Sequence, residues 1–184
     1  MSVRIDNKLL FLRHPRTGST AVSDALIERG GIKAGENHAY IHAKESELVV
    51  STIRNPYDVL ATWFELQIVY DNMPKFLLNY AHSAFKHGDR LFYFADNSDV
   101  LLCYDTLQKD LDDLLTSLDI EPVVLKRVNV TPNKRPFIDY FNNISLDIVK
   151  TIYKKDLDCY NKLLGYNSIL TNNCYYLNQG ETQA

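Results

Sequence analysis

Three short apolar runs, each followed by a segment of helical pattern, constrain the fold of this chain most strongly. They are LLFLR (9–13), LVVSTI (48–53) and VLLCY (100–104). Runs that are apolar throughout, rather than at every second residue, are typical of parallel strands covered on both faces. Their alternation with helices predicts an α/β domain with a mostly parallel central sheet flanked by helices.

The segments between and after these runs carry boundary signals. Asn55 can cap a helix whose first residue is Pro56. The apolar spacing further along predicts one long amphipathic helix over about 145–164, ended by Gly165. VVLKRV (123–128) is a candidate for a further short strand.

Length and composition fit an ordinary globular protein. The 184 residues suffice for one domain, which we place at 1–166, with a polar tail over 167–184. The net charge of −3 disfavours a nucleic-acid-binding protein, and no apolar run approaches the ~20 residues of a membrane span. The three cysteines form no CxxC pair, and we find no metal-ligand spacing. The N-terminus lacks the layout of a signal peptide, so we expect a cytoplasmic protein without membrane partners.

The loop HPRTGST follows the first apolar run. Gly18 allows a tight turn, and the helix after it directs free N–H groups and the positive end of its dipole at the loop. Arg16, Thr17, Ser19 and Thr20 add a positive charge and hydroxyl donors. The loop therefore favours a bound anion such as a phosphate, although the lysine of a Walker motif is missing. Taken alone, the same residues are equally compatible with a solvated turn and a hydroxyl helix cap.

The second polar strand end is STIRNPYDVLAT (51–62). It delivers Arg54, whose guanidinium can bind a second phosphate, and the helix that follows presents Thr62 two turns later. Alone, it is more simply a helix start beside a surface arginine. Because parallel strands end at the same edge of a sheet, the two segments together predict an anion-binding site.

The same two segments resemble the signature of sulfotransferases that use 3′-phosphoadenosine 5′-phosphosulfate (PAPS). In that family a loop P-[KR]-[ST]-G-[ST]-[ST] grips the 5′-phosphosulfate, as PRTGST (15–20) would here. A later strand ending in R-[ND]-P-x-D holds the 3′-phosphate with a hydroxyl residue eight positions on, as RNPYD (54–58) and Thr62 would. Downstream, LLCYDTLQKDLDDLLTSLDI and VNVTPNKRPFIDYFNN are similar to later parts of the carbohydrate-type branch, so the resemblance spans Leu9 to Tyr166.

The resemblance implies a P-loop NTPase-like three-layer sandwich and in-line transfer of a sulfuryl group from PAPS to an acceptor hydroxyl, with PAP as product and no metal. The expected acceptor is a small molecule or a saccharide, and a saccharide hydroxyl is what the resemblance to the carbohydrate-type branch implies. Arg16 stands where the family usually has lysine, and Thr62 where serine is usual. The cofactor-binding residues that the resemblance implies are Arg16, Thr17, Gly18, Ser19, Thr20, Arg54, Thr62, Tyr104 and Arg135.

The family's general base is a histidine or glutamate between the two phosphate motifs. GENHAYIHAKESE offers His38, His42 and Glu36, which we rank in that order. Arg16 would stabilise the leaving group. His14 directly precedes the loop and is expected to pack against it.

A second loop, VNVTPNKRP, could close over the nucleotide with Asn129, Thr131 and Arg135, whereas Lys134 is more simply part of a solvated turn. Tyr104 would border the adenine or be an ordinary aromatic residue at a sheet edge. Two other function classes stay open. One is a non-catalytic nucleotide- or anion-binding module of the same fold, and the other is a divergent P-loop kinase.

Overall fold

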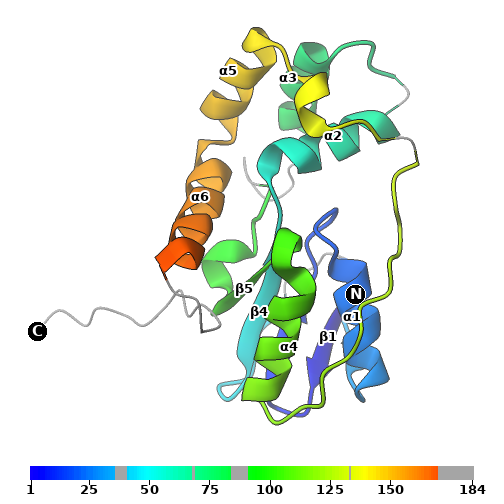
Figure 1. Cartoon of the computed structure of the whole chain (residues 1–184), viewed down its shortest axis with the longest axis vertical. Helices are drawn as coiled ribbons and strands as arrows, with labels where there is room; N and C mark the ends of the chain where they lie inside the picture. Colours follow the sequence, from blue (N-terminus) through cyan, green and yellow to red (C-terminus); the bar gives the residue numbers. More distant parts are fainter. Residues whose placement is uncertain (36–40, 68, 84–90, 133, 170–184) are drawn as a thin grey trace, which may run out of the picture.

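All three apolar runs form parallel strands of one sheet, the first two in its interior and the third at its edge. They are β2 (Leu9–Leu12), β4 (Leu48–Ile53) and β5 (Val100–Cys103), paired in parallel in that order. The structure is a computed structural model that describes residues 1–35, 41–67, 69–83, 91–132 and 134–169. Figure 1 shows the arrangement.

Two further strands make the sheet mixed. β1 (Ser2–Ile5) pairs antiparallel with β2, and β3 (Ile32–Ala34) pairs antiparallel with β1, giving the order β3-β1-β2-β4-β5 in the described part of the chain. The predicted α/β class with helices flanking a central sheet is confirmed, but the sheet is mixed rather than mostly parallel, because two of these four pairings are antiparallel. The cause is the short turn between β1 and β2, where Asp6 and Asn7 adopt positive φ angles of 32° and 51°. Such a tight connection can only reverse the chain.

The two faces of the sheet bury alternate residues of the same strands. Leu9 and Phe11 of β2 pack with helices α1 (Ser19–Glu28) and α4 (Leu107–Ser117), which lie in front of the sheet in Figure 1. Leu10 and Leu12 pack with Phe94 on the opposite face. Because β2 is covered on both sides, its sequence is apolar throughout.

The remaining elements are α2 (Pro56–Leu66), α3 (Met73–Ser83), α5 (Asn143–Ile152), α6 (Lys154–Ile169) and the 3-10 turns η1 (Ala95–Asn97), η2 (Tyr104–Thr106) and η3 (Phe137–Tyr140). Helix α2 begins as predicted: the Asn55 side chain accepts a hydrogen bond from the Tyr57 N–H at 3.0 Å, and Pro56 is the first helical residue. In Figure 1 this helix lies above the carboxyl ends of the parallel strands.

The predicted single helix over 145–164 is two helices, α5 and α6. The break falls at Tyr153, whose φ of −103° and ψ of 26° depart from helical values and whose side chain is buried. Gly165 does not adopt a positive φ and leaves α6 to continue to Ile169, so it does not end the helix as expected. Helix α6 thus extends into the predicted tail, and residues 170–184 lie outside the described residues.

Residues 123–128 form an extended segment rather than the expected strand. The side chain of Gln108 donates to the Val123 carbonyl at 3.0 Å and accepts from the Leu125 N–H at 2.8 Å. A side chain of α4 therefore satisfies backbone groups that a neighbouring strand would otherwise bind.

No helix in the described ranges has the length and apolar character needed to cross a membrane.

Candidate functional site

The loop between β2 and α1 has the backbone that a close-fitting anion loop needs. Gly18 has a φ of +79° and precedes the first residue of α1, and Arg16 also has a positive φ, of 64°. A Cβ atom on Gly18 would lie 2.7 Å from Leu107 Cδ2 and 3.1 Å from Tyr104 Cδ2. Both the conformation and the close neighbours therefore require glycine at this position.

Hydroxyl groups inside the loop hold its shape. Thr17 Oγ1 and Ser19 Oγ donate to the His14 carbonyl oxygen at 3.0 and 2.5 Å. Thr17 Oγ1 also lies 2.5 Å from Thr52 Oγ1 of β4. Thr17 and His14 are fully buried, and the Phe94 N–H donates to His14 Nε2 at 3.2 Å. His14 therefore packs against the loop, as the sequence predicts.

The first turn of α1 presents backbone donors beside this loop. In a helix the first N–H groups have no acceptor within the helix, which here applies to Ser19, Thr20 and Ala21. Arg13 Nη2 donates to Thr20 Oγ1 at 2.8 Å and brings a second guanidinium to the same turn. These donors and the helix dipole favour a negatively charged ligand.

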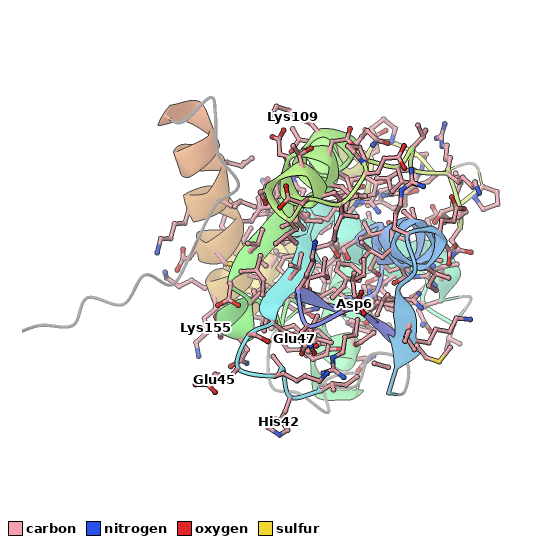
Figure 2. The ribbon with its side chains drawn as sticks, turned by 90° about the horizontal axis from the view of Figure 1, so that it is seen from below. Asp6, His42, Glu45, Glu47, Lys109 and Lys155 are labelled. Atoms are coloured by element: carbon pink, nitrogen blue, oxygen red, sulfur yellow. The ribbon has the colours of Figure 1, made fainter. Side chains whose placement is uncertain are left out.

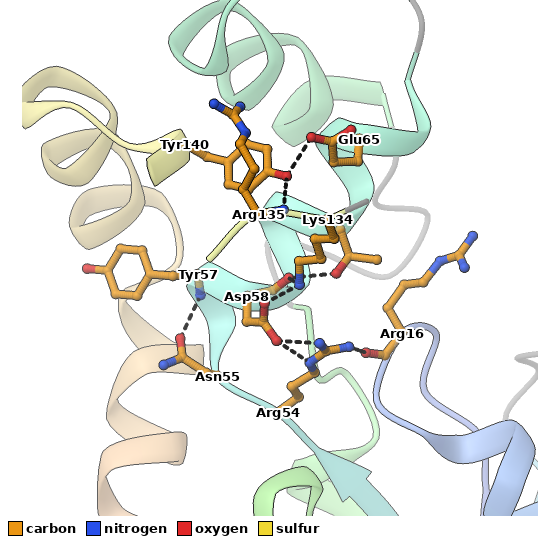
Figure 3. A network of polar contacts seen from close by, with 10 residues as sticks. Arg16, Arg54, Asn55, Tyr57, Asp58, Glu65, Lys134, Arg135 and Tyr140 are labelled. Carbon is orange, nitrogen blue, oxygen red and sulfur yellow. Dashed lines mark hydrogen bonds and ion pairs between the residues drawn. The ribbon is translucent and has the colours of Figure 1, made fainter. Parts of the chain in front are cut away.

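A second group of charges lies where β4 meets α2. Arg54 Nε donates to Asp58 Oδ2 at 2.6 Å, and Arg54 Nη1 donates to the Arg16 carbonyl oxygen at 3.0 Å. Lys134 forms an ion pair with the same Asp58 carboxylate and donates to the Asp58 carbonyl oxygen at 3.2 Å. Figure 3 shows this network. The side chains of Arg54 and Lys134 are only 14% and 13% exposed, so both cations are held at fixed positions.

Aromatic rings contact two of the arginines. The Arg54 guanidinium carbon lies 4.0 Å from the centre of the Tyr104 ring, and that of Arg16 lies 4.9 Å from the centre of the Trp63 ring. Burial lowers the pKa of Arg16 and is also the main cause of the lowered pKa of Lys134. Partial removal of water strengthens the interaction of such cations with an anion.

These parts surround one cavity of about 730 Å³, a size that suits a nucleotide. Its lining contains six cations, Arg13, Arg16, Arg54, Lys126, Arg127 and Lys134, and no described lining residue is Asp, Glu or His. In a chain of net charge −3, this concentration of positive charge is local to the cavity. The other lining residues are Pro15, Gly18, Ser19, Thr20, Ala21, Thr62, Trp63, Tyr104, Leu107, Leu125, Val128, Asn129, Val130 and Thr131.

Most of the sequence-predicted binding residues meet at this cavity: Arg16, Gly18, Ser19, Thr20, Arg54, Thr62 and Tyr104. Thr62 Oγ1 donates to the Asp58 carbonyl oxygen at 2.8 Å. Thr17 is part of the loop but not of the cavity lining, because its buried hydroxyl is bonded to His14 and Thr52. Arg135 is exposed, outside the cavity lining, with its guanidinium carbon 4.4 Å from the centre of the Tyr140 ring.

Of the three candidate bases, only His42 is among the described residues. Glu36 and His38 lie outside the described residues. His42 is exposed and is not part of the cavity lining, and its carbonyl oxygen accepts a hydrogen bond from Arg4 Nη2 at 3.1 Å. Figure 2 shows His42 at the margin of the molecule, near Glu45.

Four cavity cations were not among the predicted site residues. The interpretation of Lys134 as part of a solvated turn is wrong. Its side chain is largely buried, forms an ion pair with Asp58 and lines the cavity. Arg13 ends the LLFLR run itself, a position that brings it to the carboxyl edge of the sheet. Lys126 and Arg127 lie in the extended 123–128 segment, and no local pattern indicates that this segment crosses the cavity.

In the described part of the chain, no three His, Cys, Asp or Glu residues are grouped so that they could hold a metal ion. Comparison with protein-family models, curated proteins and solved structures finds no match to this chain.

Proposed function

We propose that this protein is a sulfotransferase that binds PAPS in the 730 Å³ cavity and transfers its sulfuryl group to an acceptor hydroxyl. The observation that carries the proposal is the charge of the lining: six cations without a described carboxylate among the lining residues, four of which lie at two anchor points, Arg13 and Arg16 at one and Arg54 and Lys134 at the other. One anchor follows β2 and the other follows β4. The proposal includes the P-loop NTPase-like arrangement of the fold.

The two anchors suit a nucleotide with anions at both ends of its ribose. The loop with Gly18 and the first turn of α1 would hold the 5′-phosphosulfate. Arg54 and Lys134 would hold the 3′-phosphate, with the Thr62 hydroxyl beside them. Tyr104 and Leu107 supply a partly apolar surface between the anchors, which suits a ribose or base.

In the transfer step the acceptor oxygen forms a bond to sulfur while the bond from sulfur to the bridging phosphate oxygen breaks. Negative charge grows on that bridging oxygen, where Arg16 and the N–H groups of the α1 start would stabilise it. A base must accept the acceptor's proton. His38 and Glu36 remain our candidates for this role, ahead of His42, whose described position is outside the cavity lining.

Turnover is the test of this proposal. The purified protein is incubated with PAPS and a panel of neutral saccharides and phenols, and mass spectrometry follows PAP and sulfated product together. Formation of equal amounts of both supports a sulfotransferase. PAP release without a sulfated product, at the rate seen in buffer, contradicts it.

A second candidate function is a non-catalytic nucleotide-binding module. It is favoured by the absence of His, Asp and Glu among the described lining residues, since a transferase needs a proton acceptor. This module would bind PAP as tightly as the enzyme would, yet show no turnover with any acceptor. A P-loop kinase has less support, because the described lining offers no carboxylate for Mg²⁺.

A further inference from the structure

Trp63 is the one tryptophan of the 184-residue sequence, and it lies in the cavity wall. It comes from α2, one residue after Thr62. The guanidinium of Arg16 covers a face of its indole ring, with 4.9 Å between the guanidinium carbon and the ring centre. The residue assigned to the leaving group therefore rests on an aromatic surface of the same cavity.

The indole is the fixed partner in this contact. Its ring lies 5.8 Å from that of Tyr80, which stacks at 4.9 Å on the fully buried Phe76. Burial raises the pKa of Tyr80, so its phenol stays neutral. A neutral, packed aromatic wall behind Trp63 holds the ring in place.

The Arg16 side chain is the movable partner. Its backbone carbonyl is held by Arg54, whereas its guanidinium makes no ion pair with a carboxylate of the described residues. Figure 3 shows the side chain directed away from the Arg54 network. A bidentate contact between a guanidinium and a phosphate or sulfate oxygen pair is stronger than a contact with an aromatic ring. An anion bound at the start of α1 would therefore draw the guanidinium from the indole.

We propose that Arg16 has two positions, one over Trp63 in the empty site and one on the donor's anion, and that its departure exposes Trp63 as the stacking surface for the acceptor. This inference rests on the proposed function. It names the acceptor by chemistry: a hydroxyl carried on an uncharged ring with an apolar face, either the C–H face of a sugar or the flat face of a phenol. It also makes binding ordered, because the acceptor surface is covered until the donor is bound.

Fluorescence of Trp63, the one tryptophan of the sequence, tests the proposed movement of Arg16. Acrylamide quenching of Trp63 is measured with and without PAP, and calorimetry on the same samples reports whether PAP binds. In the wild type we expect PAP to raise the quenching constant toward the value of Arg16→Met, in which the indole is already uncovered. In Arg16→Met, PAP should add no further increase. Arg127→Met removes another cavity cation, whereas the cation described over the Trp63 ring is Arg16, so this variant should quench like the wild type without ligand.

The outcomes separate this inference from the proposed function. If PAP binds by calorimetry but quenching stays constant or falls, Arg16 does not leave Trp63 and the inference is wrong, while the nucleotide site stands. If PAP does not bind, the proposed function fails, and inorganic sulfate takes its place as probe. A sulfate-induced rise in the wild type and not in Arg16→Met would still support the movement of Arg16, and no rise would overturn it.

Saturation-transfer NMR tests whether the acceptor stacks on Trp63. Two neutral probes are used, methyl β-glucoside and phenol. We expect ring-proton signals from at least one probe only when PAP is present in the wild type, and without PAP in Arg16→Met. The probe that responds identifies the ring class. Signals of equal strength in the unliganded wild type and in Arg16→Met would overturn the covering role of Arg16. Trp63→Phe, which keeps an aromatic face, should retain the signals, and Trp63→Ala should lose them.

Discussion

Lys134 and Arg135 are adjacent cations with different positions, and this makes them a matched pair for mutation. Lys134 is 13% exposed, lies in the cavity wall and is paired with Asp58, whereas Arg135 is exposed and outside the lining. We expect Lys134→Met to weaken PAP binding substantially and Arg135→Met to change it by less than about twofold, as for a distant screened charge.

The magnitude follows from the contacts of Lys134. A hydrogen bond to a charged group contributes about 1.5–3 kcal/mol. Because Asp58 already offsets part of the charge of Lys134, we expect the lower end of that range, or a loss of roughly 10–30-fold in affinity.

Calorimetric titration of each variant with PAP at constant ionic strength measures this difference, with urea unfolding as a control for stability. A loss of affinity in Arg135→Met as large as that in Lys134→Met, or larger, would contradict the role of Lys134. That result would assign the nucleotide contact to Arg135, which is one of the predicted cofactor-binding residues, rather than to Lys134 in the cavity wall.

Three further predictions concern Gly18, the pH dependence of PAP binding and the buried carboxylate of Asp156. Gly18→Ala should lower the free energy of unfolding by about 1–3 kcal/mol in urea titrations, because alanine must adopt a φ of +79° and displace Leu107. Burial lowers the pKa of Lys134, so PAP affinity should start to fall at a pH below that of ordinary lysine titration, and Lys134→Met should abolish this decrease. Asp156→Ala should cost about 2–4 kcal/mol of stability, because the buried carboxylate accepts two backbone N–H groups of 91–92; an unchanged urea midpoint would contradict this role.

The sequence predicts the central strands and both anchor loops because each is encoded locally. A continuous apolar run such as LLFLR indicates a strand that is buried on both faces. Gly18 indicates a backbone conformation that only glycine adopts easily. The start of α2 is equally local, since Asn55 and Pro56 act within one turn.

The errors concern features set by distant contacts. The break between α5 and α6 places Tyr153 and Asp156 in the interior, and Asp156 binds backbone groups more than sixty residues away. Residues 123–128 look like a strand, but Gln108 of another helix satisfies their backbone.

The charge of the cavity is also a tertiary property. Lys134 looks like an exposed turn residue in NKR, and only its approach to Asp58, which is 76 positions earlier, shows that it is a wall of the cavity. The sequence alone does not show which of the neighbours Lys134 and Arg135 faces the cavity. That choice depends on how the chain between α4 and η3 crosses the cavity.

One calorimetric comparison tests whether the cavity is a site for a nucleotide with anions at both its 3′ and 5′ positions. The protein is titrated with PAP and with ADP, each once with Mg²⁺ and once with EDTA. We expect PAP to bind at least about tenfold more tightly than ADP, because only PAP reaches both anchors, and to bind equally well with Mg²⁺ and with EDTA. Equal affinities, or binding of either nucleotide that requires Mg²⁺, would contradict it.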